Sequence, residues 1–200
     1  MPAYIYTKLV RDASKSGIEV TERSKKAFTW LRQRYADISK ASVAAVKFIN
    51  EADRKRKRGM VGRMYMFLYD PKGKEELPFY DRFPLIFYVK PTKGGFYGIN
   101  LHYLPPILRA KLLDALYETQ VNGVVGNETT RMKFNYDLLA SAARFRLFRP
   151  CFKRYLYNQA KSPLIYVPPE EWNMTVFLPT ENFKKATKEE VWKDSRRKVE

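Results

Sequence analysis

The chain has 200 residues, 45% of them hydrophobic and 15% aromatic, which suffices for one packed domain with helical extensions and excludes a wholly disordered chain. Its apolar runs are far shorter than the ~20 residues that a membrane-spanning helix needs, its N-terminal residues lack the pattern of a signal peptide, and its single cysteine excludes an internal disulfide. The formal net charge of +17 at pH 7 favours a polyanionic partner, with nucleic acid ahead of an anionic membrane surface or an acidic protein.

The positive charge is concentrated in two segments. Residues 23–63 contain thirteen lysines and arginines against three acidic residues, and residues 131–161 contain eight against one. The other segments are electrically balanced, so these two account for the whole excess. The sequence therefore predicts two basic surfaces beside a neutral centre, and such a charge distribution attracts polyanions.

The segment before residue 59 is predicted to form an arm followed by two helices. Residues 1–20 show no clear period and form the arm. In residues 21–38, apolar side chains recur at steps of three and four, which indicates one helical face. A second helix is expected over residues 39–57, with Gly59 as its left-handed C-terminal residue. Residues 21–58 are thus expected to be a basic helical segment.

Five consecutive cations end this second helix: Arg54, Lys55, Arg56, Lys57 and Arg58. Positive side chains in a last helical turn each gain only about 0.3–1 kcal/mol from the helix dipole, and five in succession also repel one another. The run exceeds what a helix end needs, so we interpret it, together with Arg63, as a contact surface for a polyanion. A solvated helix end is the alternative interpretation.

Residues 62–106 hold the centre of the predicted fold. Three runs of strand length, rich in aromatic and β-branched residues, cover residues 64–69, 84–89 and 96–104, and each ends in a group of turn residues. The glycines that follow Lys93 suit a tight hairpin between the second and third runs. We expect a small, twisted antiparallel sheet or an SH3-like β-barrel, flanked by N-terminal and C-terminal helices.

Two helices are predicted after these strands. Pro106 suits the first helical turn, and an apolar face that includes Leu108 and Leu112 should cover one side of the sheet. The second helix, over residues 128–149, leads into a segment in which cations alternate with aromatic rings. We expect the rings to lie in the core, and the cations form either a solvated face or a phosphate clamp. The candidate phosphate ligands are Arg144, Arg146, Arg149, Lys153 and Arg154.

The C-terminal part is predicted to add two strands and a helix. Short apolar runs indicate strands at residues 164–167 and 172–178, and a capping box from Thr187 to Glu190 begins a final helix. The chain is therefore predicted to be an α+β protein. Its parts are an arm at 1–20, a basic helical segment at 21–58, and a sheet- or barrel-centred domain at 59–200 with a basic helical insertion at about 128–161.

The sequence contains no motif for nucleotide binding, metal binding or nucleophilic catalysis. It has no P-loop, and the glycines at 94, 95 and 98 lack the spacing of a dinucleotide site. One histidine, His102, and one cysteine, Cys151, cannot build the usual zinc site. Cys151 lies in an apolar run beside Pro150, so we expect a buried, unreactive thiol and not a nucleophile.

The carboxylates of the predicted sheet are also expected to be structural. Asp70 precedes a proline in a turn, and Asp81 can pair with Arg82 or cap its loop. Nothing in the spacing of these residues with Glu75 and Glu76 indicates a magnesium site. We therefore expect a protein that is not an enzyme and that needs no metal or cofactor.

Several segments resemble a family of virion-associated proteins of T4-like tailed phages. The likeness covers roughly residue 25 to the end, and its segments are residues 64–72, 77–85, 95–105, 148–153, 171–172 and 177–180. It implies the function of a DNA end protector, which would bind the termini of packaged DNA and shield them from host exonuclease. The family supplies no active-site residues.

Two functions are therefore open at this point. The first is a DNA-binding protein of the virion that contacts phosphates without reading sequence. The second is a structural component of the phage neck, tail or baseplate, present in several copies, whose basic faces would contact acidic surfaces of neighbouring subunits. Either protein would be made in the cytoplasm of the bacterial host, and neither would contact a membrane.

Overall fold

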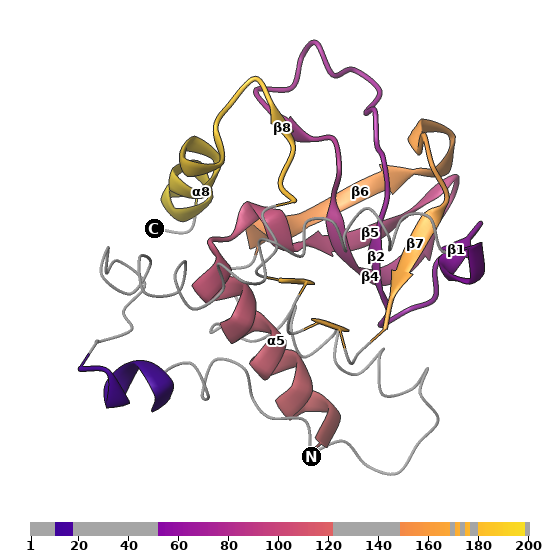
Figure 1. Cartoon of the computed structure of the whole chain (residues 1–200). Helices are drawn as coiled ribbons and strands as arrows, with labels where there is room; N and C mark the ends of the chain where they lie inside the picture. Colours follow the sequence, from indigo (N-terminus) through magenta and orange to yellow (C-terminus); the bar gives the residue numbers. More distant parts are fainter. Residues whose placement is uncertain are drawn as a thin grey trace.

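The chain forms an antiparallel sheet with helices packed at its sides (Figure 1). The computed structural model describes residues 11–17, 52–121, 149–168, 171–172, 175–176 and 180–198. The helices expected at 21–38 and 128–149 and most of the one expected at 39–57 lie outside these ranges, as do Arg144 and Arg146. The expected arm includes a short helical stretch at residues 11–15. No helix in the described ranges is both long enough and apolar enough to span a bilayer.

The main sheet has six strands in the order β1-β7-β2-β4-β5-β6. All neighbouring strands are antiparallel. The strands are β1 (Lys55–Arg56), β2 (Met64–Met66), β4 (Leu85–Thr92), β5 (Gly95–Asn100), β6 (Phe152–Leu156) and β7 (Leu164–Val167). Each predicted central run thereby contains a strand and the run at 164–167 is β7, but the first run is a strand only to Met66 and the third only to Asn100, where a 3-10 turn follows.

The expected hairpin joins β4 to β5. Thr92 pairs with Gly95 at its end, and Gly94 has a φ of +73°, a backbone conformation that side chains with a Cβ rarely adopt. A β-bulge shifts the pairing between Tyr88 and Lys90, which increases the local twist of the hairpin.

The alternative of an SH3-like barrel is wrong, because the sheet is open. In the described part of the chain no pairing joins the outer strands β1 and β6, which lie at opposite edges. The sheet does not need to close on itself, because other elements cover its two faces. Helix α5 (Pro106–Val121) packs on one face, and residues 59–63 fold over the other.

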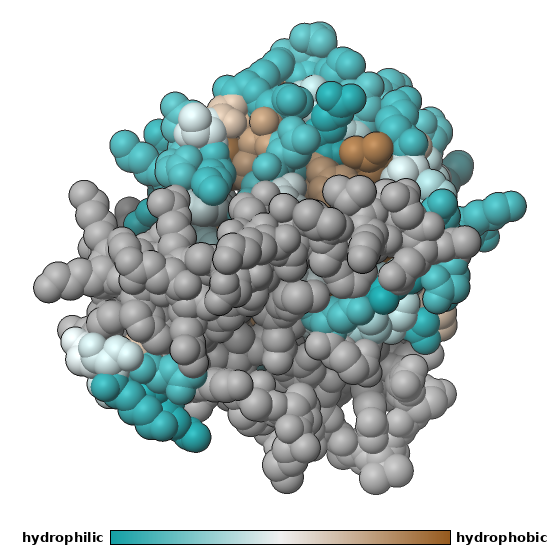
Figure 2. All heavy atoms as spheres, in the orientation of Figure 1, coloured by the Kyte–Doolittle hydropathy of each residue, from teal (hydrophilic) through white to brown (hydrophobic). Residues whose placement is uncertain are grey.

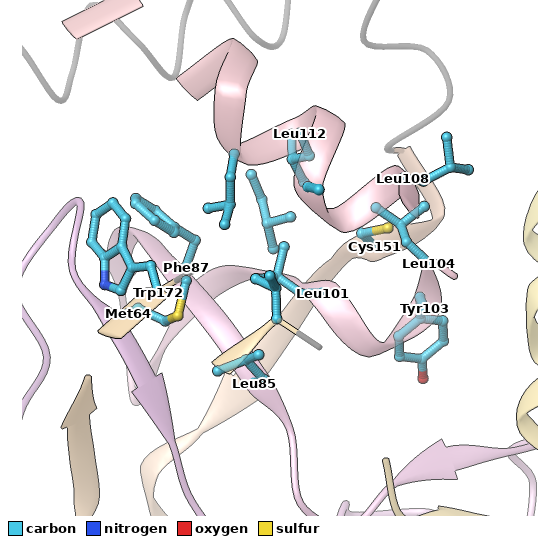
Figure 3. Close-up of a cluster of buried hydrophobic side chains, with 14 of the residues drawn as sticks. Met64, Leu85, Phe87, Leu101, Tyr103, Leu104, Leu108, Leu112, Cys151 and Trp172 are labelled. Atoms are coloured by element: carbon cyan, nitrogen blue, oxygen red, sulfur yellow. The ribbon is translucent and has the colours of Figure 1, made fainter. Parts of the chain in front are cut away.

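Alternation along the strands separates the core into two clusters, as expected for side chains that point to opposite faces. On the α5 face, Met64 and Phe87 pack with Leu108 and Leu112. Figure 3 shows Leu112 pointing from the helix toward the sheet, with the Trp172 ring beside that of Phe87, 4.9 Å between centroids. The cover that the sequence predicted for α5 is confirmed.

The other face is unusually aromatic. Its buried residues are Tyr65, Phe67, Tyr69, Ile86, Tyr88, Phe96, Tyr155 and Leu164. Rings meet edge to face or stacked, with centroids 4.7 Å apart for Tyr88 and Phe96 and 5.3 Å apart for Phe67 and Tyr155. Such pairs add about 0.5–1.5 kcal/mol each beyond the area they bury. The expectation that the rings near β6 belong to the core is confirmed for Tyr155.

A small ribbon and the C-terminal helix complete the fold. Strands β3 (Tyr80–Asp81) and β8 (Phe183–Lys184) form a separate two-stranded sheet among the described residues. Helix α8 (Lys188–Arg197) begins with the predicted capping box of Thr187 and Glu190. The α8 ring of Trp192 donates from Nε1 to the carbonyl of His102 at 2.8 Å, in the 3-10 turn η2 (Leu101–Tyr103). This bond fixes α8 beside the end of β5.

Two predicted elements are wrong in type. Lys55 and Arg56 do not continue a helix, because after the 3-10 turn η1 (Ala52–Arg54) they pair with β7 as an edge strand. The strand expected at 172–178 is helical where the structure describes it, at residues 171–172 and 175. There the amide of Val176 donates to the carbonyl of Trp172 at 3.1 Å. In both places tertiary contacts override the local pattern.

Candidate nucleic-acid interface

The five cations at residues 54–58 do not form a uniform surface. Arg54 is partly buried and makes a two-pronged ion pair with Glu171, with Nη1–Oε2 and Nη2–Oε1 distances of 2.6 and 3.0 Å. Its side chain is only 18% exposed. The next four side chains, Lys55, Arg56, Lys57 and Arg58, are exposed, and Arg56 bonds only to nearby carbonyls. Arg54 is therefore neutralised by Glu171 and does not belong to the predicted contact surface.

Residues 59–63 cross from the edge of the sheet to its middle, where they place the positive charge of Arg63. The amide of Gly62 donates to the carbonyl of Tyr88 at 2.8 Å, and the amide of Tyr88 donates to the carbonyl of Arg63 at 2.9 Å. Gly59 lies so close to the Tyr88 ring that a Cβ there would come within 2.3 Å of it. This glycine is therefore needed for close packing and not, as the sequence suggested, for ending a helix.

A hollow of about 530 Å³ results between this crossing segment and the β4–β5 hairpin. Arg58 and Arg63 line one side, the Gly94–Gly95 turn lines the other, and Tyr88 and Tyr157 contribute their hydroxyls, which are 3.0 Å apart. Burial raises the pKa of Tyr88, although the Arg58 charge opposes this. We call this hollow the hairpin groove.

The second basic segment reaches the same hairpin from the opposite edge of the sheet. Arg154, on β6, is exposed and donates to the carbonyl of Lys93 at 3.3 Å. Lys93 is itself exposed at the hairpin tip. β1 and β6 are the outer strands of the main sheet, so described cations from both basic segments lie around the hairpin. We call these cations the basic band: Lys57, Arg58, Arg63, Lys93 and Arg154.

Within the described residues, no carboxylate pairs with any member of the basic band. The contacts of Arg63 and Arg154 are with a ring and a carbonyl: the Arg63 guanidinium lies 5.2 Å from the centroid of the Tyr166 ring, and Arg154 bonds the Lys93 carbonyl. Their charge is consequently available to an external anion. In Figure 2 the visible described surface is mainly hydrophilic, with small hydrophobic areas in its upper half.

Lys153, the neighbour of Arg154, points elsewhere. Its ammonium lies 4.1 Å from the centroid of the Tyr103 ring, in a second hollow of about 450 Å³ that we call the β6 cleft. Burial and the nearby Lys198 charge lower the pKa of Lys153. The cleft is lined by Tyr69, Pro71, Lys72, Leu77, Pro78, Phe79, Tyr80, Asp81, Tyr103, Lys153, Arg154, Tyr155, Leu156 and Lys198.

A buried polar network forms the floor of the β6 cleft. Asp81 Oδ2 accepts from Asn100 Nδ2 at 3.0 Å and lies 2.7 Å from His102 Nδ1, while Asn100 Nδ2 also donates to Tyr155 Oη at 3.1 Å. Asp81 Oδ1 accepts from the amide of Phe83. Burial alone would raise the pKa of Asp81, but His102 and these donors outweigh it and hold the pKa below its usual value.

Asp81, His102 and Thr180 lie at the distances expected of a hydrolase catalytic triad, since His102 Nε2 lies 3.1 Å from Thr180 Oγ1. His102, however, is fully buried, and its three polar partners tie β3, β5 and the segment before β8 together. The expectation that Asp81 caps its loop is confirmed, whereas it pairs with His102 and not with Arg82. Among the described residues no group of three possible metal ligands converges.

Cys151 and Asp70 have the structural roles that the sequence predicted. Cys151 is fully buried, and burial raises the pKa of its thiol to about 12, so it is not a nucleophile at neutral pH. Asp70 pairs with Lys74 four residues later, with an Oδ1–Nζ distance of 3.1 Å. Both residues are thereby removed from the list of catalytic candidates.

One buried charge was missed by sequence reasoning. Arg109, on α5, is fully buried, pairs with Glu181 and donates to the carbonyls of Leu104 and Val176 at 2.7 and 3.1 Å. Burial would raise the pKa of Glu181, but Arg109 outweighs this effect and lowers it. In sequence, Arg109 resembles an exposed cation in an amphipathic helix, and its partner lies seventy-two residues away.

The predicted phosphate ligands therefore fall into four groups. Arg54 is paired internally, Lys55 and Arg56 lie on the edge strand, and Arg149 is exposed just before β6. Of the remaining predicted ligands that the structure describes, Arg58 and Arg63 line the hairpin groove, Lys153 and Arg154 line the β6 cleft, and Lys57 is exposed next to Arg58. Sequence reasoning missed Lys72, Lys93 and Lys198, and the only signal for them was the position of Lys93 at the predicted hairpin tip.

Comparison with known proteins bears directly on this basic surface. A family model described as "Phage T4 terminal DNA protecting protein" matches residues 19–195. No curated protein and no solved structure matches the chain. The matched range contains both basic segments, the hairpin groove, the buried network beneath the β6 cleft, and every lining residue of that cleft except Lys198.

Proposed function

Since the chain belongs to the phage T4 terminal DNA protecting protein family, we propose that it shields DNA ends by holding the phosphate backbone against the basic band. The protein protects DNA ends and is not an enzyme, as the family shows. The sequence-based expectations of DNA-end protection and of a non-enzymatic role are thereby confirmed. The role of individual residues is the subject of the proposal.

The observation that carries the proposal is a set of positive side chains around one hairpin that have no carboxylate partner in the described part of the chain. Lys57, Arg58 and Arg63 come from one basic segment and Arg154 from the other, and Lys93 joins them at the tip. Unpaired surface cations that follow a groove are the usual means of holding a phosphate backbone. A structural protein that binds acidic neighbours is the weaker alternative, because the family is defined by DNA ends.

To protect a DNA end, the protein needs to cover it and does not need to catalyse a reaction. Phosphate contacts fix a protein on DNA without reading its sequence, so a protein that contacts the last phosphates of a duplex blocks the approach of an exonuclease by occupying the same surface. This mechanism needs neither metal nor nucleophile. We further propose that it operates in the virion on packaged DNA, beside other phage proteins.

Digestion of a linear duplex by an exonuclease tests the proposal. The variant Arg58→Gln/Arg63→Gln removes the two cations that line the hairpin groove. The control, Lys184→Gln/Lys193→Gln, removes two exposed cations that line neither hollow. We expect the groove variant to lose protection and the control to retain it. Equal protection by both variants would refute the role of the band.

A further inference from the structure

The β6 cleft combines two chemically different walls. One wall is apolar and aromatic, formed by Leu77, Pro78, Phe79 and Tyr80 of the loop that precedes and includes β3. The other lining residues include the cations Lys72, Lys153, Arg154 and Lys198, and the Lys198 ammonium lies 5.6 Å from the centroid of the Phe79 ring. A volume of about 450 Å³ lies in the range of small-molecule sites, so the cleft has room for a single nucleotide.

Lys153 is the most informative cation of the cleft. It is only partly exposed, and the structure gives it no carboxylate within ion-pair distance among the residues described; its contact is with the Tyr103 ring. A cation that is partly removed from water without a counter-charge is costly. Asp194 acts on Lys153 only from beyond ion-pair distance and is held by Lys198 at 2.6 Å, so an anion bound in the cleft would supply a closer counter-charge.

The carboxylate of the cleft does not oppose such an anion strongly. Asp81 is buried, and its oxygens are occupied by Asn100, His102 and the Phe83 amide. These donors offset part of its negative charge. Among the described residues, in contrast, no carboxylate forms an ion pair with Lys153 or Arg154.

The aromatic wall is held in place before any ligand arrives. Lys185 donates from Nζ to the carbonyls of Lys74 and Glu75, both at 2.8 Å, and so ties the loop to the end of β8. The Phe79 ring meets that of Phe183 edge to face, 6.4 Å between centroids. Phe79 and Tyr80 nevertheless remain partly exposed, so part of each ring can still contact a ligand.

We infer that the β6 cleft takes the terminal nucleotide of a DNA strand, with its base against Phe79 or Tyr80 and its phosphate at Lys153 and Arg154; this inference rests on the proposed function. A base inside a duplex is covered on both faces by its neighbours, whereas the last base has one free face and is unstacked at low cost. Aromatic side chains bind such bases without sequence preference.

The cleft also explains how the protein distinguishes an end from continuous DNA. Arg154 lines the cleft and also bonds the hairpin tip of the basic band, so the two sites share this residue. The band would hold the backbone of any duplex, and the cleft would add affinity only where a strand ends. Preference for ends thus comes from a pocket that internal nucleotides do not enter.

Binding to open and closed DNA ends tests this inference. The probes are a 20-base-pair duplex with one blunt end and one hairpin-closed end, and the same duplex closed at both ends. We expect Lys153→Gln and Phe79→Leu each to weaken binding of the open duplex by about fivefold or more and to leave the closed duplex unchanged. Lys153→Arg should retain binding, and thermal unfolding should confirm that each variant is folded.

The outcomes separate the cleft from the band. If the cleft variants lost affinity equally for both probes, Lys153 would be an ordinary backbone contact. If they lost affinity for neither probe, the cleft would bind no nucleotide. Each result would overturn the cleft inference and leave the proposal for the basic band intact. Loss on both probes in Arg58→Gln/Arg63→Gln, with the open-end preference retained, would support the cleft independently. A wild-type protein without preference for the open duplex would overturn the cleft.

Discussion

The salt dependence of DNA binding gives the sharpest measure of the basic band. Each phosphate contact contributes about 0.9 to the slope of log affinity against log salt on duplex DNA. We expect Arg58→Gln/Arg63→Gln to flatten that slope by about 1.8, because both guanidinium groups line the hairpin groove without carboxylate partners among the described residues. Between 50 and 200 mM salt, the affinity gap between wild type and variant should then shrink by about twelvefold.

Arg54 supplies a control from the same run of cations. Its charge is already balanced by Glu171 in a two-pronged pair, so it should release no counterions from DNA. The double variant Arg54→Gln/Glu171→Gln keeps the net charge and should keep the slope. Fluorescence anisotropy of a labelled duplex across a salt series measures both. An unchanged slope in the groove variant, or an equal change in the control, would refute the assignment of these contacts.

Three further outcomes follow from buried groups. Asp81 and Glu181 have lowered pKa values in the folded protein. Their contribution to stability is therefore fully present above their unfolded-state pKa values and is lost as pH falls through their folded-state pKa values, so the urea concentration at the unfolding midpoint should drop below about pH 4. The variant Asp81→Ala should lower the free energy of unfolding by about 3–5 kcal/mol at pH 7. A midpoint that is constant down to pH 3 would contradict this. Binding of open DNA ends should weaken as pH rises through the lowered pKa of Lys153, and Lys153→Arg should remove that dependence; identical pH profiles would exclude Lys153 as a ligand. Cys151, with a thiol pKa of about 12, should not react with a thiol reagent at pH 8 until urea unfolds the chain; rapid labelling of the native protein would show that the thiol is accessible.

The elements that the sequence predicted correctly are those whose own residues determine their structure. Strands β2, β4, β5 and β7 bury side chains on both faces of the sheet, so they read as nearly continuous apolar runs. Helix α5 begins at a proline pair, and α8 begins with a capping box that is satisfied in both directions. Local chemistry and tertiary packing agree in these segments, which is why reading the pattern was sufficient.

The prediction of a strand at residues 172–178 was wrong for a specific reason. Trp172 and Val176 are four residues apart, and this separation places two side chains on one face both in a strand and in a helix. The pattern therefore fits either structure. The structure resolves the ambiguity through the bond from the Val176 amide to the Trp172 carbonyl and through the contact of the Trp172 ring with Phe87.

Of the candidate site, only the positive charge of its residues could be predicted from the sequence. The sequence showed which residues are positive, but whether a cation is free depends on partners far away along the chain. Glu171 neutralises Arg54 over 117 residues, and Lys93 joins Arg154 over 61 residues. The β6 cleft was also out of reach, because the ribbon of β3 and β8 that supports it has only two residues per strand and leaves no periodic signal.

The open sheet offers a competing explanation for part of the basic surface. Exposed edge strands pair with other chains unless something prevents it, and charged residues, lysine above all, are a common means of prevention. The edge strand β1 consists of Lys55 and Arg56 alone, so these two cations are explained by protection of the edge. That account does not extend to Arg58 and Arg63, which follow the strand and lie over the middle of the sheet beside Tyr88. Loss of the β1 charges should therefore promote self-association, whereas loss of the groove charges should weaken binding to DNA, and the two effects can be measured separately.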